Sequence, residues 1–274
     1  MADATLASKL DEIVAHKRTE VAGLYERQPL DQWRRAADQS PWPIRDFAAS
    51  LRRHSQPPER LAVIAEIKRA SPSAGTIAGE IDAQAVARTY AGAGAACISV
   101  LTDERFFAGD NQTLTAVRSL DLPPPVLRKD FLIDPVQVYE ARAIGADAVL
   151  LIAECLSPDT LAELFALTRE LGMQALVELY DEANLDAVLA IGPDIVGVNN
   201  RDLATFAVDI DHSRRLRARV PRPVLFVSES GLRTGADTVP LLGAEVDAVL
   251  VGETLMRSGD VAATLAELAT GTAP

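Results

Sequence analysis

From Leu61 onward, short apolar runs alternate with stretches whose apolar residues recur at helical spacing. The runs are rich in Val, Ile, Leu and Ala, which is typical of strands buried on both faces, and they span 61–68, 96–101, 126–130, 147–152, 174–179, 194–199, 224–228 and 247–251. The helical stretches lie between them at 82–92, 111–120, 135–144, 158–171, 183–190, 234–243 and 260–269. This order predicts a parallel sheet with crossover helices.

Eight strands in about 190 residues match a (β/α)8 TIM barrel of the α/β class. A doubly wound open sheet is the alternative, but it usually has fewer strands and a glycine-rich first turn. The turn after the first strand reads Arg-Ala-Ser-Pro-Ser over residues 69–73, without a GxGxxG pattern. We therefore predict the barrel.

The first 60 residues follow a different pattern. Apolar residues recur at helical spacing near the start, at Leu6, Leu10, Ile13, Val14, Val21 and Leu24. Prolines and tryptophans then interrupt the periodicity, at Pro29, Trp33, Pro41, Trp42 and Pro43. Phe47 and Leu51 indicate a short second helix that ends before Pro57 and Pro58. We predict a helical N-terminal extension (1–60) packed on a single catalytic barrel (61–274), with a partial role as a lid as the alternative.

Composition narrows the classes of partner. The chain has 274 residues, 48% hydrophobic and 24% charged, and is long enough to bury a large core. Its net charge of -12 argues against nucleic acid or an anionic membrane as the main partner, although a small phosphate ligand needs only local donors. No signal peptide and no apolar run of about 18 residues is apparent, so we expect a cytoplasmic protein without a spanning helix.

Two residue types that often carry chemistry are uninformative in this chain. Cys97 and Cys155 lie in apolar runs and are expected to be buried thiols, because a structural disulfide would be unusual in an intracellular protein. His16, His54 and His212 are scattered without metal-ligand spacing. We therefore expect chemistry that uses neither a metal nor a cofactor.

Charged residues recur at the carboxyl ends of the predicted strands, where barrel enzymes place their catalytic groups. Glu66 and Lys68 alternate along the first strand, so they share the interior face with Ala62 and Ile64. The later strand ends add Lys129, Glu178, Asn199 and Glu229.

The charged members of this set all lie on odd-numbered strands, and alternate strands fill the same interior layer of a barrel. We expect Lys68, Lys129, Glu178 and Glu229 to alternate in one layer, with Glu66 beneath. A structural ion-pair network is the alternative. However, buried charges seldom stabilise a protein more than apolar packing does, which favours a catalytic role.

The last two strands end in glycine-containing turns, Ser228-Glu229-Ser230-Gly231 and Val251-Gly252-Glu253-Thr254. Loops at these positions form the usual phosphate site of such barrels, and glycine allows close approach of backbone amides. Ser71 and Arg201 would add donors, whereas the Glu253 carboxylate must point away from the anion. Four loop aspartates are expected to be helix caps and turn residues, namely Asp103, Asp110, Asp130 and Asp134.

Taken together, six segments resemble indole-3-glycerol-phosphate synthase in colinear order. They are Ala-Glu-Ile-Lys-Arg-Ala-Ser-Pro-Ser (65–73), Val-Leu-Arg-Lys-Asp-Phe (126–131), Leu-Val-Glu-Leu (176–179), Gly-Val-Asn-Asn-Arg-Asp-Leu (197–203), Ser-Glu-Ser-Gly (228–231) and Val-Leu-Val-Gly-Glu-Thr-Leu-Met (249–256). The resemblance implies conversion of 1-(2-carboxyphenylamino)-1-deoxyribulose 5-phosphate to indole-3-glycerol phosphate, CO2 and water in tryptophan biosynthesis. One departure is Ala74, where many relatives carry a basic residue.

The resemblance also implies roles for residues. Lys129 would be the general acid and Glu178 the base in the later loss of water, with Lys68 assisting; which lysine donates at which step stays open. Glu66, Asn199 and Glu229 would orient the substrate and the lysines. Phe131 and Leu151 would form an apolar wall, and the phosphate would be held by Ser71, Ser230, Gly231 and Gly252.

Two other functions remain as alternatives. One is another phosphate-binding barrel, such as phosphoribosylanthranilate isomerase or the tryptophan synthase α subunit. The other is a barrel that binds a phosphorylated ligand without catalysis. The complete acid–base set argues against both, and we expect a monomer that acts on a small phosphorylated substrate.

Overall fold

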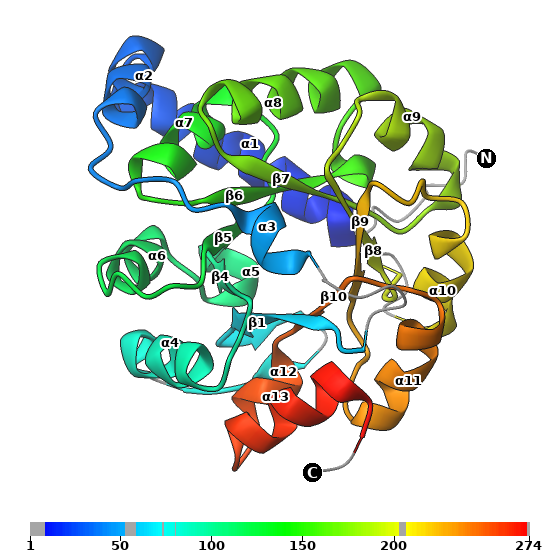
Figure 1. Cartoon of the computed structure of the whole chain (residues 1–274). Coiled ribbons are helices and arrows are strands. Elements are labelled where there is room, and N and C mark those ends of the chain that lie inside the picture. Colours follow the sequence, from blue (N-terminus) through cyan, green and yellow to red (C-terminus); the bar gives the residue numbers. More distant parts are fainter. Residues whose placement is uncertain (1–8, 53–58, 73, 80, 203–206, 273–274) are drawn as a thin grey trace, which may run out of the picture.

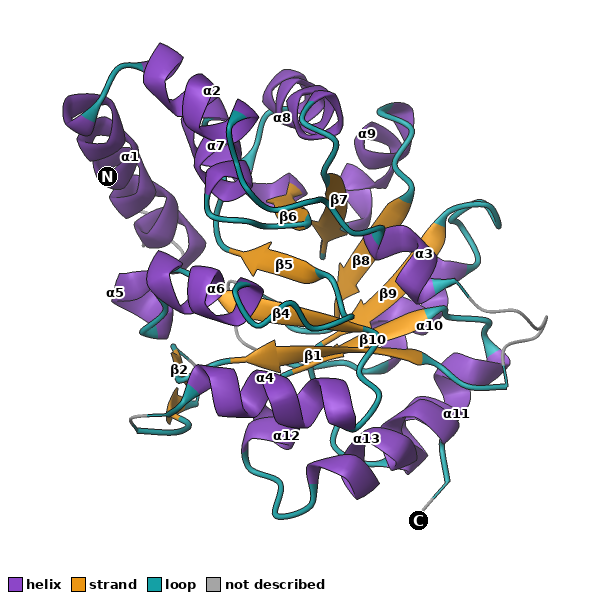
Figure 2. Cartoon of the chain, turned by 60° about the vertical axis from the view of Figure 1, so that its left-hand side comes forward, coloured by secondary structure: helices purple, strands orange, loops and turns teal. Residues whose placement is uncertain are grey.

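The computed structural model describes residues 9–52, 59–72, 74–79, 81–202 and 207–272, which form a closed barrel of eight parallel strands (Figures 1 and 2). The barrel strands are β1 (Ala62–Ile67), β4 (Cys97–Leu101), β5 (Val126–Lys129), β6 (Ala148–Ile152), β7 (Gln174–Leu179), β8 (Ile195–Asn199), β9 (Leu225–Glu229) and β10 (Ala248–Val251). They follow chain order around the ring, and β10 closes it against β1. The predicted (β/α)8 fold is confirmed, with every strand boundary within one residue of its prediction.

Helices surround the barrel and separate its successive strands (Figure 2). They are α4 (Ala83–Gly92), α6 (Asn111–Arg118), α7 (Pro135–Ala143), α8 (Pro158–Glu170), α9 (Leu185–Ala190), α10 (Asp211–Arg217), α11 (Gly235–Gly243) and α13 (Val261–Thr270). The sequence did not predict α10. That helix buries Leu216 together with the polar residues His212 and Ser213, so it lacks a clear apolar stripe.

The strands are buried on both faces because they pack in two directions. Along β1, Ala62 and Ile64 belong to the apolar cluster inside the barrel. Val63 and Ala65 belong to the cluster between the barrel and its helices. This alternation explains the nearly continuous apolar runs in the sequence.

The N-terminal extension forms the three helices α1 (Lys9–Arg27), α2 (Leu30–Asp38) and α3 (Phe47–Leu51). In α3, Phe47 and Leu51 are fully buried in the interior cluster. The Ala48 amide also donates to the side chain of Gln174, at the start of β7, over 2.8 Å. Thus α3 closes the amino-terminal end of the barrel, so that the cavity opens at the other end.

The sequence pattern does not predict α2, because Pro29 and Trp33 interrupt the apolar periodicity there. Pro29 instead occupies the N-cap position, where its missing amide donor is not needed. The helix buries Trp33 and Ala37 in a small cluster that also contains residues of α7. Several positions used in the predictions, Leu6, His54, Pro57, Pro58 and Ser73, lie outside the described residues.

Several short elements follow the carboxyl ends of the strands. They are the hairpin β2 (Ala70–Ser71) and β3 (Gly75–Thr76), helix α5 (Glu104–Phe107), the 3-10 turns η1 (Ala153–Cys155) and η2 (Glu182–Asn184), and helix α12 (Glu253–Met256). Both cysteines are free thiols, and Cys155 is half-buried, not fully buried as predicted. Among the described helices, none combines the length and apolar character needed to cross a membrane.

Candidate active site

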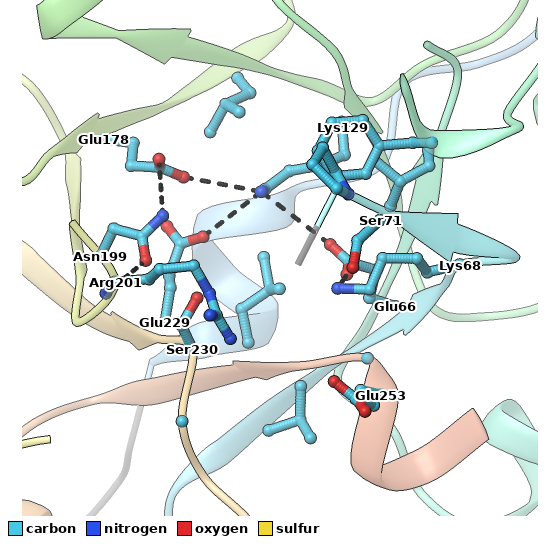
Figure 3. A pocket seen from close by; sticks show the side chains of 18 of the residues that line it. Glu66, Lys68, Ser71, Lys129, Glu178, Asn199, Arg201, Glu229, Ser230 and Glu253 are labelled. Atoms are coloured by element: carbon cyan, nitrogen blue, oxygen red, sulfur yellow. Dashed lines mark hydrogen bonds and ion pairs between the residues drawn. The ribbon is translucent and has the colours of Figure 1, made fainter. Parts of the chain in front are cut away.

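A cavity of about 370 Å³ opens at the carboxyl ends of the strands. Every predicted site residue except Leu151 lines it (Figure 3): Glu66, Lys68, Ser71, Lys129, Phe131, Glu178, Asn199, Arg201, Glu229, Ser230, Gly231, Gly252 and Glu253. These residues come from six of the eight strand ends, so the barrel brings together positions spread over nearly 190 residues of chain.

Lys129 projects into a ring of three carboxylates (Figure 3). Its Nζ lies 3.6 Å from Glu178, 3.7 Å from Glu229 and 3.9 Å from Glu66. The four residues come from β7, β9, β1 and β5, which are alternate strands of the barrel. The predicted layer exists, but its composition was wrong. Glu66 belongs to it, whereas Lys68 follows the end of β1 and, among the described residues, forms an ion pair with Glu66 alone, at 2.7 Å.

The ring keeps Lys129 protonated. Burial alone would lower the pKa of this ammonium, but the charges of Glu178, Glu229 and Glu66 outweigh burial and raise it above its usual range. Burial would raise the pKa of the Glu66 carboxyl, but the positive charges of Lys68 and Lys129 outweigh burial and lower it. Lys129 and Glu66 therefore form an ionised pair near neutral pH.

Glu229 behaves differently from Glu66. Its side chain is 1% exposed, and neither of its oxygens has a hydrogen-bond partner among the described residues. Burial and the neighbouring Glu178 raise its pKa well above the usual range, although Lys129 opposes the effect. Gly197 makes room for this carboxyl, because a Cβ there would collide with Glu229 Oε1. Glu229 therefore keeps its proton to a higher pH than an ordinary glutamate does.

Asn199 links the ring to the next loop. Its Nδ2 donates to Glu178 Oε1 over 3.1 Å, and its Oδ1 accepts the backbone amide of Arg201 at 2.9 Å. The two bonds fix both the amide orientation and the start of the loop that carries Arg201. This arrangement leaves Glu178 Oε2 facing Lys129 without a hydrogen-bond partner in the described part of the chain.

The two predicted phosphate turns differ in geometry. Ser230 and Gly231 both have left-handed backbone conformations, with φ of 70° and 83°. A Cβ on Gly231 would also approach Val208 too closely, so glycine is required there. Gly252 has a φ of -116° and a different role: an added Cβ would lie 2.5 Å from Glu66 Oε1, so this glycine makes room for the acid on β1.

Two further groups lie near these turns. The Glu253 carboxylate accepts from Arg257 Nε at 3.0 Å, which supplies a counter-charge for the acid that the sequence placed beside the phosphate. Ser71 Oγ accepts the Ala74 amide at 3.1 Å, which holds the first loop at the rim.

The apolar wall is shifted by one residue from the prediction on β6. Leu150 and Ile152 line the cavity, whereas Leu151 points outward into the cluster beneath the helices. The reason is strand alternation: consecutive side chains face opposite sides, and the all-apolar run Ala-Val-Leu-Leu-Ile contains no polar residue to mark the faces. Phe131 does line the cavity, and its ring lies 6.0 Å from that of Phe107.

Helix α1 contributes residues that the sequence did not assign to the site. Lys9, Leu10 and Ile13 line the cavity, consistent with the alternative in which the extension partly covers the site. Their apolar periodicity indicates packing, and Ile13 does pack, in the same apolar cluster as Phe131.

The same helix carries Lys17, which is 1% exposed. Its Nζ lies 2.9 Å from Asp103 and 2.8 Å from Asp130, the residue that follows Lys129. Burial would raise the pKa of Asp130, but Lys17 and Arg128 lower it to about 2. Asp103 does cap α5, as predicted, by accepting the Phe106 amide at 2.7 Å. The ion pairs were not predicted, because no local pattern connects position 17 with positions 103 and 130.

The assembled groups are those of acid–base catalysis: a protonated lysine, a carboxyl able to hold a proton, carboxylates, and an apolar wall for a ring. Within the described residues, no group of three His, Cys, Asp or Glu side chains is placed to hold a metal ion.

Comparisons with known proteins identify a family that the chain matches over most of its length. A family model described as indole-3-glycerol phosphate synthase matches residues 10–268. The protein of that name from Roseiflexus castenholzii is 51% identical over 268 residues, covering 94% of this chain and 97% of the relative. The one from Rhodopirellula baltica is 49% identical over 253 residues, covering 92% and 95%.

Solved structures support the fold. The chain resembles 3-hexulose-6-phosphate synthase from Salmonella typhimurium with a TM-score of 0.61 and 16% identity, over 75% of this chain and 95% of the other. It also resembles 3-keto-L-gulonate-6-phosphate decarboxylase from Vibrio cholerae with a TM-score of 0.59 and 16% identity, over 76% and 94%. At this identity the likeness concerns the barrel architecture alone.

Proposed function

The chain belongs to the indole-3-glycerol phosphate synthase family, and we propose that it performs the family's reaction through the lysine and glutamate ring at its strand ends. The enzyme is a carboxy-lyase of tryptophan biosynthesis. It converts 1-(2-carboxyphenylamino)-1-deoxyribulose 5-phosphate to indole-3-glycerol phosphate with loss of CO2 and water. The two alternatives, an isomerase of the same pathway and a non-catalytic barrel, are not supported by this membership.

The observation that carries the mechanism is the position of Lys129 among three carboxylates. In the first step, the aryl carbon that bears the carboxylate attacks the ketone carbon of the sugar, and the carbonyl electrons move to oxygen. Lys129 stabilises that oxyanion and gives it a proton. Its raised pKa does not prevent the transfer, because an alkoxide is a much stronger base than an amine.

Loss of CO2 then returns the electron pair to the six-membered ring and restores its aromaticity. The remaining hydroxyl must leave as water, which requires one proton delivered to oxygen and one removed from the new five-membered ring. Glu229 can deliver the proton that its raised pKa retains, and the adjacent Glu178 can accept the other. Asn199 holds Glu178 in place for this step.

The remaining groups orient the substrate. Ser71, Ser230 and Gly231 line the cavity, and they would bind the phosphate together with Arg201. Phe131, Leu150 and Ile152 would hold the aromatic ring against the sugar, which favours the folded reactive conformation. Lys68, anchored to Glu66, would contact the anionic groups of the substrate.

We also propose that the enzyme acts as a monomer in the cytoplasm. All catalytic groups named above come from one chain, so no partner is needed to complete the cavity. The two free thiols are consistent with a reducing compartment. Sedimentation at micromolar concentration would test the oligomeric state.

The direct test is incubation with the carboxyphenylamino sugar phosphate while indole fluorescence and CO2 release are followed. We expect Lys129→Met to lower kcat by roughly 10²–10⁴, the usual contribution of a positioned general acid. Lys68→Met is the matched control, because it removes a lysine of the same cavity that pairs with a single carboxylate in the described part of the chain; we expect its main effect on KM. Wild-type turnover in Lys129→Met would refute the mechanism, whereas absence of both products with the unmodified enzyme would refute the function.

A further inference from the structure

Asn200 is a fully buried side chain outside the predicted set, at the junction of β8, β9 and α10. Its Nδ2 donates to Ser228 Oγ and to the carbonyl of Ser230, both over 3.1 Å. Its Oδ1 accepts the amide of Ser213 at 3.0 Å. Its backbone amide donates to the carbonyl of Glu229 at 2.8 Å. Asn200 therefore contacts three consecutive residues at the end of β9, the strand that supplies Glu229 and the turn after it.

The turn that Asn200 contacts has an unfavourable backbone conformation. Ser230 is one of four non-glycine residues with positive φ among the described residues, and Gly231 continues the left-handed region. Such a conformation persists in a residue with a Cβ only where the surroundings impose it, and it occurs most often at binding sites. The hydrogen bond from Asn200 Nδ2 to the Ser230 carbonyl holds the peptide unit that joins Ser230 to Gly231.

We propose that Asn200 is a positioning residue for phosphate recognition. Its side chain holds Ser230 and Gly231 in the left-handed turn that lines the cavity, and the turn in that conformation binds the phosphate of the substrate. This inference rests on the proposed function, since it assigns the phosphate to this turn. Asn200 does not itself line the cavity, so its effect on the ligand passes through the turn.

A positioning role and a purely structural role for Asn200 predict different effects on phosphate binding. A residue that only stabilises the barrel would lower the melting temperature when replaced, but the folded fraction would bind phosphate normally. A residue that holds the turn would weaken phosphate binding in protein that is fully folded. Glu229 should be less affected, because its carbonyl accepts a bond from the backbone amide at position 200, which any substitution except proline keeps.

The experiment measures binding of inorganic phosphate by titration calorimetry, well below the melting temperature, together with kcat and KM for the sugar phosphate. We expect Asn200→Ala to weaken phosphate binding about tenfold and to raise KM similarly, as loss of one or two buried hydrogen bonds implies, with kcat changed less than KM. Asn200→Asp is the second variant. It keeps the side-chain volume and the oxygen that accepts the Ser213 amide, but it replaces the nitrogen that donates to the Ser230 carbonyl with an oxygen. It should also weaken phosphate binding, so the test survives if the alanine variant does not fold.

Asn184→Ala is the matched control. Asn184 also anchors a loop at the barrel rim through its side-chain amide, which donates to Glu154 at 2.9 Å, but it lies after β7 and does not line the cavity. This variant should bind phosphate as tightly as the wild type. Equal phosphate affinity in wild type, Asn200→Ala and Asn200→Asp would overturn the inference, as would failure of the wild type to bind phosphate.

A double-mutant cycle tests the conformational part. Glycine adopts the left-handed conformation without strain, so Ser230→Gly should make the turn less dependent on Asn200. We expect Asn200→Ala to weaken phosphate binding less in the Ser230→Gly background than in the wild type. Strictly additive effects would contradict a role through the turn. An enzyme that binds phosphate in this Asn200-dependent way but forms no indole would refute the proposed function and leave the inference intact.

Discussion

Replacing Glu229 by glutamine should make the protein more stable and less active. The Glu229 carboxyl is buried, and both of its oxygens lack hydrogen-bond partners among the described residues. Burial and the negative charge of Glu178 raise its pKa, so that folding favours the protonated form. Glutamine has nearly the same shape as that neutral form, and its amide could donate to Glu178 Oε2, which also has no hydrogen-bond partner in the described structure.

The pH dependence of the gain in stability follows from the linkage between proton binding and folding. In the unfolded chain the pKa of Glu229 is about 4.5, and in the folded chain it is higher. Its favourable contribution is therefore complete below pH 4.5 and is lost as the pH rises through the folded-state value. Each pH unit of this interval corresponds to about 1.4 kcal/mol. The glutamine variant should therefore be more stable than the wild type at pH 7, and its gain in stability should be smaller at pH 5.

Urea unfolding at the two pH values measures this difference directly, and indole formation at pH 7 gives the activity. We expect a larger free energy of unfolding at pH 7 than in the wild type, a smaller gain at pH 5, and a kcat lower by about 10² or more because the retained proton is lost. A variant destabilised at pH 7, or stabilised equally at both pH values, would refute the electrostatic reasoning. Unchanged kcat would instead remove Glu229 from the proton transfers.

Two further predictions test contacts revealed by the structure. Lys17→Met leaves the Asp103 carboxylate buried without this cation and leaves Asp130 paired with Arg128 but not with Lys17. We expect a loss of about 3–5 kcal/mol in the free energy of unfolding by urea at pH 7, and a loss below about 1 kcal/mol would contradict the importance of this link. Leu150→Ala and Leu151→Ala should each lower the free energy of unfolding by about 2–5 kcal/mol. Only Leu150→Ala should also reduce kcat/KM, because Leu150 lines the cavity and Leu151 does not. Equal kinetic effects would show that the apolar wall is wrongly assigned.

The barrel was predictable from the sequence because its strands are buried on both faces. That burial produces apolar runs such as residues 61–68 and 147–152, which stand out against the amphipathic helices between them. Charged side chains at the ends of such runs are conspicuous for the same reason, so Lys129, Glu178 and Glu229 could be identified without any structure. Helix α10 was missed because its buried face is polar and lacks the apolar stripe on which helix prediction depends.

What the sequence could not supply is the direction of each side chain and the contacts between distant segments. Leu150 and Leu151 are chemically alike, so only the register of β6 decides which one faces the cavity. Similarly, Glu66 and Lys68 share a face, but β1 ends at Ile67, which leaves Lys68 above the ring and Glu66 in it. The ion pairs of Lys17 depend on how α1 docks, which no local pattern encodes.

The ring also explains how a protein of net charge -12 can bind an anionic substrate. Whenever Glu229 holds its proton, the two positive charges of Lys68 and Lys129 match the two negative charges of Glu66 and Glu178, so this cluster is close to neutral. Four cations line the same cavity, namely Lys9, Arg201, Arg233 and Arg257, of which Lys9 is paired with Glu12 and Arg257 with Glu253. A nearly neutral cluster adds little negative charge to oppose them. In the proposed mechanism, the proton that Glu229 delivers is therefore the same proton that removes a negative charge from the binding site.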